Sequence, residues 1–215
     1  MSKVSPSIYI LHGDDEFSIQ ETINRQLKPR MGESANAEMN ITTLDGETTT
    51  QRELQSETHA MPFLTERRMV ILSHPLGLAK GQREREAFLS ILGEIPPSTA
   101  CILKIDKLLE GEHWLLGWAR EHPQKTWSRA FRLPQGQAMT RWIQERAQTK
   151  GGTFTDDAAQ LLATYINEDP RLASQEIEKL LAYVNYQRPV RDQDVRQLTA
   201  DVRQGDVFEM VDAIS

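Results

Sequence analysis

The chain has 215 residues, 39% hydrophobic and 26% charged, and its mean hydropathy is −0.52. This composition fits one large or two small folded domains, and it excludes both an intrinsically disordered and a membrane-spanning chain. Every apolar run is shorter than the roughly 20 residues that span a bilayer, and the start of the chain lacks the hydrophobic segment of a signal peptide. We therefore expect a cytoplasmic protein without a membrane partner.

Charge and cysteine content limit the possible chemistry. The chain carries 25 basic and 31 acidic residues, a net charge of −6, which repels a phosphate backbone unless the contact is local or shared with partners. One cysteine, Cys101, excludes an internal disulfide and a multi-cysteine zinc site, and its apolar neighbours indicate a buried residue. The five histidines lack the i, i+4 spacing of a metal site. We predict no metal and no other cofactor.

The first part of the chain, residues 1–134, alternates short apolar runs with amphipathic stretches, which is typical of an α/β domain. The predicted strands cover residues 8–11, 39–44, 69–72, 100–105 and 126–133, and helical spacing is found over residues 17–27, 50–59, 82–92 and 112–120. The strand at 100–105 is almost continuously apolar. Such strands predict a parallel sheet covered by helices on both faces.

The pattern changes after Pro134. Helices are predicted at residues 138–149, from 155, at 170–184 and from about 191, so residues 135–204 form a small helical domain. No strand is predicted there. The last segment, residues 205–215, contains an amphipathic helix that reaches the final residue without a stop signal. We expect it to begin a third domain and the sequence to be part of a longer protein.

The first predicted strand runs into Gly13, Asp14, Asp15 and Glu16, where a P-loop would lie in a nucleotide-binding domain. A P-loop needs a second glycine followed by Lys and Ser/Thr, whose groups contact phosphates and magnesium. Three successive acids instead repel a polyphosphate. The fourth strand also ends in Asp106 without an adjacent catalytic glutamate. We interpret the acids as a solvated turn and helix N-terminus, and not as a metal cluster.

The connection before the third strand contains Met61, Pro62, Phe63 and Leu64. Pro62 interrupts the helical pattern, and neighbouring side chains in a loop point in different directions and cannot easily share one core face. Two interpretations remain. The pair Phe63 and Leu64 packs beneath the loop as a small satellite core, which sequence alone slightly favours, or it is exposed as an anchor for a protein partner.

Several runs together resemble the delta subunit family of bacterial DNA polymerase III, the clamp-opening subunit of the sliding-clamp loader. The order and spacing of these runs carry the resemblance over all 215 residues. The runs are Tyr9–Phe17, Met61–Arg68 followed by Val70–Leu72, Asn167–Arg171 leading to Glu176–Leu180, and Val207–Ile214, which is similar to the beginning of the family's third domain.

The resemblance implies an AAA+-like first domain without a functional P-loop, a helical lid and a helical collar domain. It implies that Met61, Pro62, Phe63 and Leu64 bind the beta sliding clamp and help open the ring for loading onto primed DNA. The other implied partners are the ATPase subunits, delta-prime and primed DNA within the assembled complex. No catalytic residue is implied, so the chain would be a non-catalytic subunit of the polymerase holoenzyme.

The sequence departs from the family at two places. A small polar residue is common where Pro62 stands, and the order of Phe63 and Leu64 varies; Pro170 replaces a common Leu, while Arg171 keeps a basic position.

Two rival classes are weighed against the resemblance. An active AAA+ ATPase or nucleotide switch subunit is opposed by the missing P-loop Lys and Ser/Thr. Arg129 lies in a run similar to the arginine-finger run of clamp-loader ATPases, but a lone arginine in an exposed strand is usually structural. The related delta-prime and ATPase subunits usually carry a four-cysteine zinc module, which one cysteine cannot build.

Overall fold

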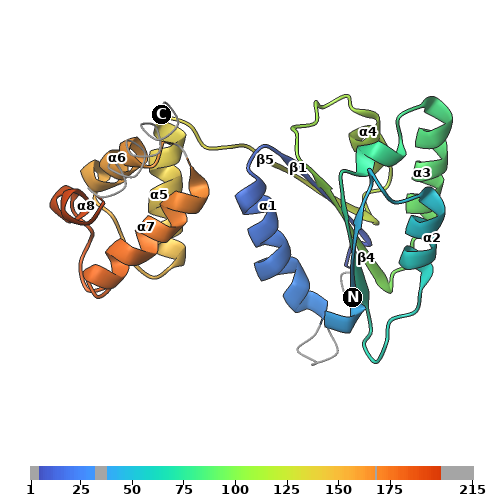
Figure 1. The fold of residues 1–215 in the computed structure, drawn as a ribbon, viewed down its shortest axis with the longest axis horizontal. Coiled ribbons are helices and arrows are strands. Elements are labelled where there is room, and N and C mark those ends of the chain that lie inside the picture. Colours follow the sequence, from blue (N-terminus) through green and yellow to red (C-terminus); the bar gives the residue numbers. More distant parts are fainter. Residues whose placement is uncertain (1–4, 32–37, 168, 200–215) are drawn as a thin grey trace, which may run out of the picture. The chain divides into compact units, whose positions relative to one another are not determined.

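The computed structural model describes residues 5–31, 38–167 and 169–199 (Figure 1). By its internal contacts the chain divides into two units, Met1–Arg132 and Leu133–Ser215. The predicted start of a third domain, residues 205–215, lies outside the described residues. No helix in the described part of the chain is long and apolar enough to cross a membrane.

The first unit is built on a parallel five-stranded sheet with the order β2-β3-β4-β1-β5. Each predicted strand is confirmed with small shifts of its ends, since the apolar runs supply buried side chains to both faces. The strands are β1 (Ile8–Gly13), β2 (Ile41–Asp45), β3 (Arg68–Ser73), β4 (Thr99–Ile105) and β5 (Thr126–Phe131).

Helices cover both faces of this sheet (Figure 1). One face carries α1 (Glu16–Thr22), which continues as the π-helical η1 (Ile23–Leu27) and the 3-10 turn η2 (Lys28–Met31). The other carries α2 (Gln51–His59), α3 (Gln82–Glu94) and α4 (Trp114–Glu121). Two further 3-10 turns are η3 (Glu38–Asn40) and η4 (Pro75–Leu78).

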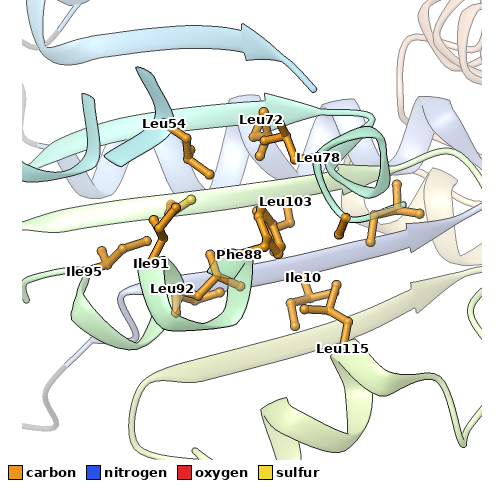
Figure 2. Packing of buried hydrophobic residues seen from close by; sticks show 14 of the residues in the cluster. Ile10, Leu54, Leu72, Leu78, Phe88, Ile91, Leu92, Ile95, Leu103 and Leu115 are labelled. Atoms are coloured by element: carbon orange, nitrogen blue, oxygen red, sulfur yellow. The ribbon is translucent and has the colours of Figure 1, made fainter. Parts of the chain in front are cut away.

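Alternation along the strands produces two separate cores. Ile10 and Leu103 point to the face covered by α3 and pack with Phe88 and Leu92 (Figure 2). The neighbouring Leu11 belongs to the cluster on the opposite face, beneath α1. Because successive side chains of a strand point to opposite faces, near-continuous apolar runs are needed to fill both cores. The predicted parallel sheet between two helical layers is confirmed.

The described residues of the second unit, 133–167 and 169–199, are helical, as predicted. They form α5 (Gln137–Thr149), α6 (Asp156–Tyr165), α7 (Pro170–Tyr183) and α8 (Asp192–Leu198), packed around a core that includes Met139, Ile143 and Leu180. One isolated parallel bridge joins Phe154 to Val190. The sequence did not indicate it, because a single bridged residue on each side has no alternating pattern to detect.

Candidate functional site

Residues 60–67 connect α2 to β3 and expose large apolar side chains. Met61 is 89% exposed, Phe63 55% and Leu64 72%. The exposed large apolar residues of the described chain are Met39, Met61, Phe63, Leu64, Tyr183 and Tyr186, so half of them lie in this loop. The interpretation of Phe63 and Leu64 as a buried satellite core is therefore wrong. A cluster of exposed large apolar residues is typical of a surface that binds another molecule.

The main chain of the loop is fixed although its side chains face outward. The Asn40 amide nitrogen Nδ2 donates to the Phe63 carbonyl oxygen at 2.8 Å, and the Phe63 N–H donates to Asn40 Oδ1 at 2.6 Å. Asn40 is only 4% exposed. Sequence reasoning missed this residue, which lies 23 positions before Phe63. No local pattern links the two.

The end of the loop is attached to three other parts of the first unit. Arg67 Nη2 donates to the Pro6 carbonyl oxygen at 2.8 Å. Arg68, the first residue of β3, donates from Nη2 to Glu57 Oε2 at 2.8 Å and to Thr42 Oγ1 at 3.0 Å. These bonds join the loop to the N-terminal segment, to α2 and to β2. With Asn40, they hold the loop near Phe63 and at its entry into β3.

Leu64 has a left-handed backbone conformation, with φ of 55°. This conformation costs an L-residue with a side chain roughly 1 to 2 kcal/mol, and it persists only where the surroundings impose it. The hydrogen bonds of Asn40 to Phe63 and of Thr65 Oγ1 to the Arg67 carbonyl oxygen (2.8 Å) lie on either side of Leu64. Strain of this kind is concentrated at functional sites, which singles out Leu64 within the loop.

The loop after β1 is occupied by groups that stabilise the fold. Asp15 is 3% exposed, and its Oδ1 accepts the Ser18 N–H at 2.9 Å, which caps α1. Glu16 Oε1 accepts from Lys104 Nζ at 2.5 Å, and Asp14 is exposed. The expected helix N-terminus is present. The expectation of a solvated turn is wrong for Asp15, because its main-chain N–H donates to the Phe131 carbonyl oxygen at 3.4 Å, which holds the residue against the end of β5 while its side chain caps α1.

His12, immediately before this loop, is also a structural residue. Its Nδ1 accepts the Leu109 N–H at 3.1 Å, and its ring is buried. Burial and, to a lesser degree, the nearby charges of His113 and Arg132 lower the pKa of His12 below its usual 6.5. The ring is therefore a neutral hydrogen-bond acceptor at pH 7. The described residues contain no group of three or more His, Cys, Asp or Glu side chains placed to hold a metal ion.

Three other residues considered in the sequence analysis, Cys101, Arg129 and Arg171, have contacts within their own unit of the fold. Cys101 is fully buried, and burial raises the pKa of its thiol to about 12. Arg129 is exposed on β5, with its guanidinium carbon 4.9 Å from the centre of the Phe131 ring. Asp169 Oδ1 accepts the Arg171 N–H at 2.7 Å, so the main chain of Arg171 belongs to the N-terminal cap of α7.

The strand order β2-β3-β4-β1-β5, with helices on both faces and a helical unit after it, defines an AAA+-like α/β fold. Its loop after β1 lacks the Lys and Ser/Thr of a P-loop. The family described as "DNA polymerase III, delta subunit" matches residues 9–119. The chain belongs to this family.

A curated sequence and a solved structure, both from Bacillus subtilis, are similar to most of the chain. DNA polymerase III subunit delta of strain 168 is 24% identical over an alignment of 225 residues. The alignment covers 96% of this chain and 60% of the relative. The solved structure of the DNA clamp loader delta protein has a TM-score of 0.75 and 22% identity, covering 89% of this chain and 57% of that one. The chain thus spans about 60% of the length of the curated relative.

Proposed function

We propose that this chain binds the beta sliding clamp through Met61, Pro62, Phe63 and Leu64, and that this binding helps to open the ring for loading onto primed DNA. The observation that carries the proposal is the exposure of Phe63 and Leu64 on a loop whose main chain is held by a buried Asn40. Membership of the delta subunit family supports it, as does the name of the structural relative, a DNA clamp loader delta protein.

The size of the apolar groups suits a small docking site. Fully burying one such exposed side chain contributes about 1.5 to 3 kcal/mol. Because Phe63 is 55% and Leu64 72% exposed, the two together can contribute roughly 2 to 4 kcal/mol on binding, or about 20- to 600-fold in affinity. A few central anchors usually carry most of the binding energy of a protein interface. A loop that is already ordered loses less conformational entropy on binding, which favours affinity further.

Ring opening requires only binding energy. A ligand shifts an equilibrium between closed and open states by the difference in its affinity for the two states. In this proposal, the chain performs no covalent chemistry and binds the open clamp more tightly than the closed one. ATP hydrolysis belongs to the neighbouring ATPase subunits, which together with delta-prime and primed DNA are the other proposed partners. The net charge of −6 supports a protein, and not DNA, as the direct target.

The test is a double substitution, Phe63→Ala with Leu64→Ala, measured by surface plasmon resonance against the clamp of the same organism. We expect affinity to fall at least about 20-fold. The melting temperature should change little, because both side chains are more than half exposed. The matched control replaces Tyr183 and Tyr186, which are 48% and 49% exposed on the helical unit, by Ala. The control should bind like the wild type; a double loop variant that does so too would refute the proposed site.

The rival function, an active ATPase or nucleotide switch subunit, has a direct test. Calorimetric titration of the chain with magnesium ATP should give no binding heat, because the loop after β1 has acids where a P-loop has Lys and Ser/Thr. Micromolar binding in this titration would favour the rival over a subunit that only binds its partners.

A further inference from the structure

Met39 is a large, exposed apolar residue that lies outside the proposed clamp-binding residues Met61, Pro62, Phe63 and Leu64. It lies in η3, just before β2, and is 70% exposed. Outside residues 60–67, it is the one member of the exposed large apolar set that belongs to the first unit, among the described residues. Its position in the sequence, more than 20 residues before the loop, gives no reason to connect the two.

The structure connects them through Asn40. This residue follows Met39 directly, and its buried side chain forms hydrogen bonds with both main-chain groups of Phe63. Residues 38–40 are thereby held against the centre of the exposed loop. Met39 therefore lies next in sequence to the residue that binds the main chain of the loop carrying Met61, Phe63 and Leu64.

We propose that the clamp-binding surface consists of both segments, residues 38–40 and 60–64, with Met39 as an additional apolar contact and Asn40 as the positioning residue that joins them. This inference rests on the proposed function, because it takes the sliding clamp as the partner. It adds a second segment and a supporting residue to that site.

The partner that covers Phe63 is expected to cover Met39 as well. A specific protein interface buries about 800 Å² on each side, far more than two side chains supply. An interface of this size that is centred on Phe63 must extend to neighbouring residues, and the segment hydrogen-bonded to Phe63 through Asn40 is one of these neighbours. Methionine suits such a position, because its flexible and polarizable side chain adapts to an irregular apolar surface.

Asn40 is chemically matched to its task. Its amide supplies one donor and one acceptor, which meet the carbonyl oxygen and the N–H of the same residue, Phe63. Aspartate has no amide donor and would place carboxylate oxygen against the Phe63 carbonyl. Alanine offers neither group. Loss of the amide therefore releases the main chain at the anchor, and a released loop must lose more entropy when it binds.

The first experiment needs no clamp. Amide hydrogen exchange of Phe63 is compared between the wild type and Asn40→Ala, and we expect exchange at least about tenfold faster in the variant, since its hydrogen-bond acceptor is gone. The matched control is Thr126→Val. Like Asn40, Thr126 bonds to main chain through its side chain: its one hydroxyl hydrogen is shared between the carbonyl oxygens of Ala119 and His122. It lies in β5, at the opposite edge of the sheet from β2. Exchange at Phe63 should stay at the wild-type rate in this control.

The second experiment measures clamp affinity in the 215-residue chain. We expect Asn40→Ala to weaken binding about 5- to 20-fold and Met39→Gln about fivefold, with Thr126→Val unchanged. Repeating Asn40→Ala in the Phe63→Ala background separates positioning from general destabilisation. If Asn40 acts through Phe63, its effect should shrink to less than half in that background. Met39→Gln alters only an exposed side chain, so it tests the surface even if Asn40→Ala unfolds.

The outcomes distinguish this inference from the proposed function. Wild-type affinity in both Met39→Gln and Asn40→Ala, with weakened binding in Phe63→Ala, would overturn the two-segment surface and leave the loop proposal standing. Wild-type exchange of Phe63 in Asn40→Ala would overturn the positioning role. A wild-type chain that does not bind the clamp at all would overturn the proposed function itself.

Discussion

Gly13, at the end of β1, lies so close to Phe131 in β5 that a Cβ atom on Gly13 would stand 1.7 Å from the Phe131 carbonyl oxygen. Gly13 also has a φ of +144°, which L side chains rarely adopt. The glycine that the sequence placed in a degenerate phosphate loop is therefore required by the pairing of two strands.

Gly13→Ala should be strongly destabilising, because the contact is with main chain that cannot move aside. We expect the free energy of unfolding to fall by about 3 kcal/mol or more, measured by urea denaturation. Gly93→Ala is the matched control: Gly93 lies in α3 with open space around its Cβ direction, and alanine there should be neutral or stabilise by up to about 1 kcal/mol. Equal stabilities of the two variants would contradict the close approach.

His12 should make the fold less stable as pH falls. Burial lowers the pKa of His12 below 6.5, so in the window beneath 6.5 the unfolded chain binds a proton that the folded chain refuses. Protonation would also break the bond in which Nδ1 accepts the Leu109 N–H.

The check is urea denaturation at about pH 5.5 and about pH 7.5 for the wild type and His12→Asn. The loss of stability between the two pH values should be smaller in the variant. NMR titration of the His12 ring should give a pKa below 6.5; a value above it would contradict the buried neutral ring.

Asp194 should contribute stability at neutral pH that disappears in acid. Arg188 donates from Nη1 to Asp194 Oδ2 at 2.7 Å and from Nη2 to Oδ1 at 2.8 Å, and the Arg191 N–H donates to Oδ2 at 2.8 Å. Chiefly through Arg188, these bonds lower the pKa of Asp194 from 3.8 to about 2. Because the folded pKa is the lower one, the contribution is present above 3.8 and is lost as pH falls towards 2.

Asp194→Asn should therefore cost about 1 to 2 kcal/mol at neutral pH, a modest value since Arg188 is partly exposed to solvent. Urea denaturation measures it. Asp192→Asn, which alters an exposed pair with Arg196 at 3.6 Å, is the control and should cost less. A cost for Asp194→Asn no greater than that of the control would contradict the prediction.

Cys101 should be chemically inert in the folded protein. Its side chain is fully buried, and burial raises the pKa of its thiol to about 12, so almost no thiolate is present at neutral pH. A thiol reagent such as Ellman's should react only in denaturant. Rapid reaction of the native chain would show that the sheet opens around β4 far more readily than its packing indicates.

The predictability of the fold can be traced to particular residues. The run Ala100–Ile105 is apolar enough to fill both faces of a strand, and Thr155 is a recognisable helix cap, so element types followed from local patterns. The bridge between Phe154 and Val190 was not predictable, because each side contributes one residue. Asp15 was predicted at a helix N-terminus, but its burial depends on how α1 packs.

The sequence alone determined the alternating α/β domain, the helical domain after it and the absence of a P-loop pattern, since these depend on residue order and spacing. Tertiary structure decided the exposure of Phe63 and Leu64 and the role of Asn40. Two large apolar residues in a loop can face inward or outward, and the choice depends on what the folded chain places beside them. Here the buried side chain of Asn40, 23 residues away, forms hydrogen bonds with the main chain of Phe63, and the Phe63 side chain stays exposed to solvent.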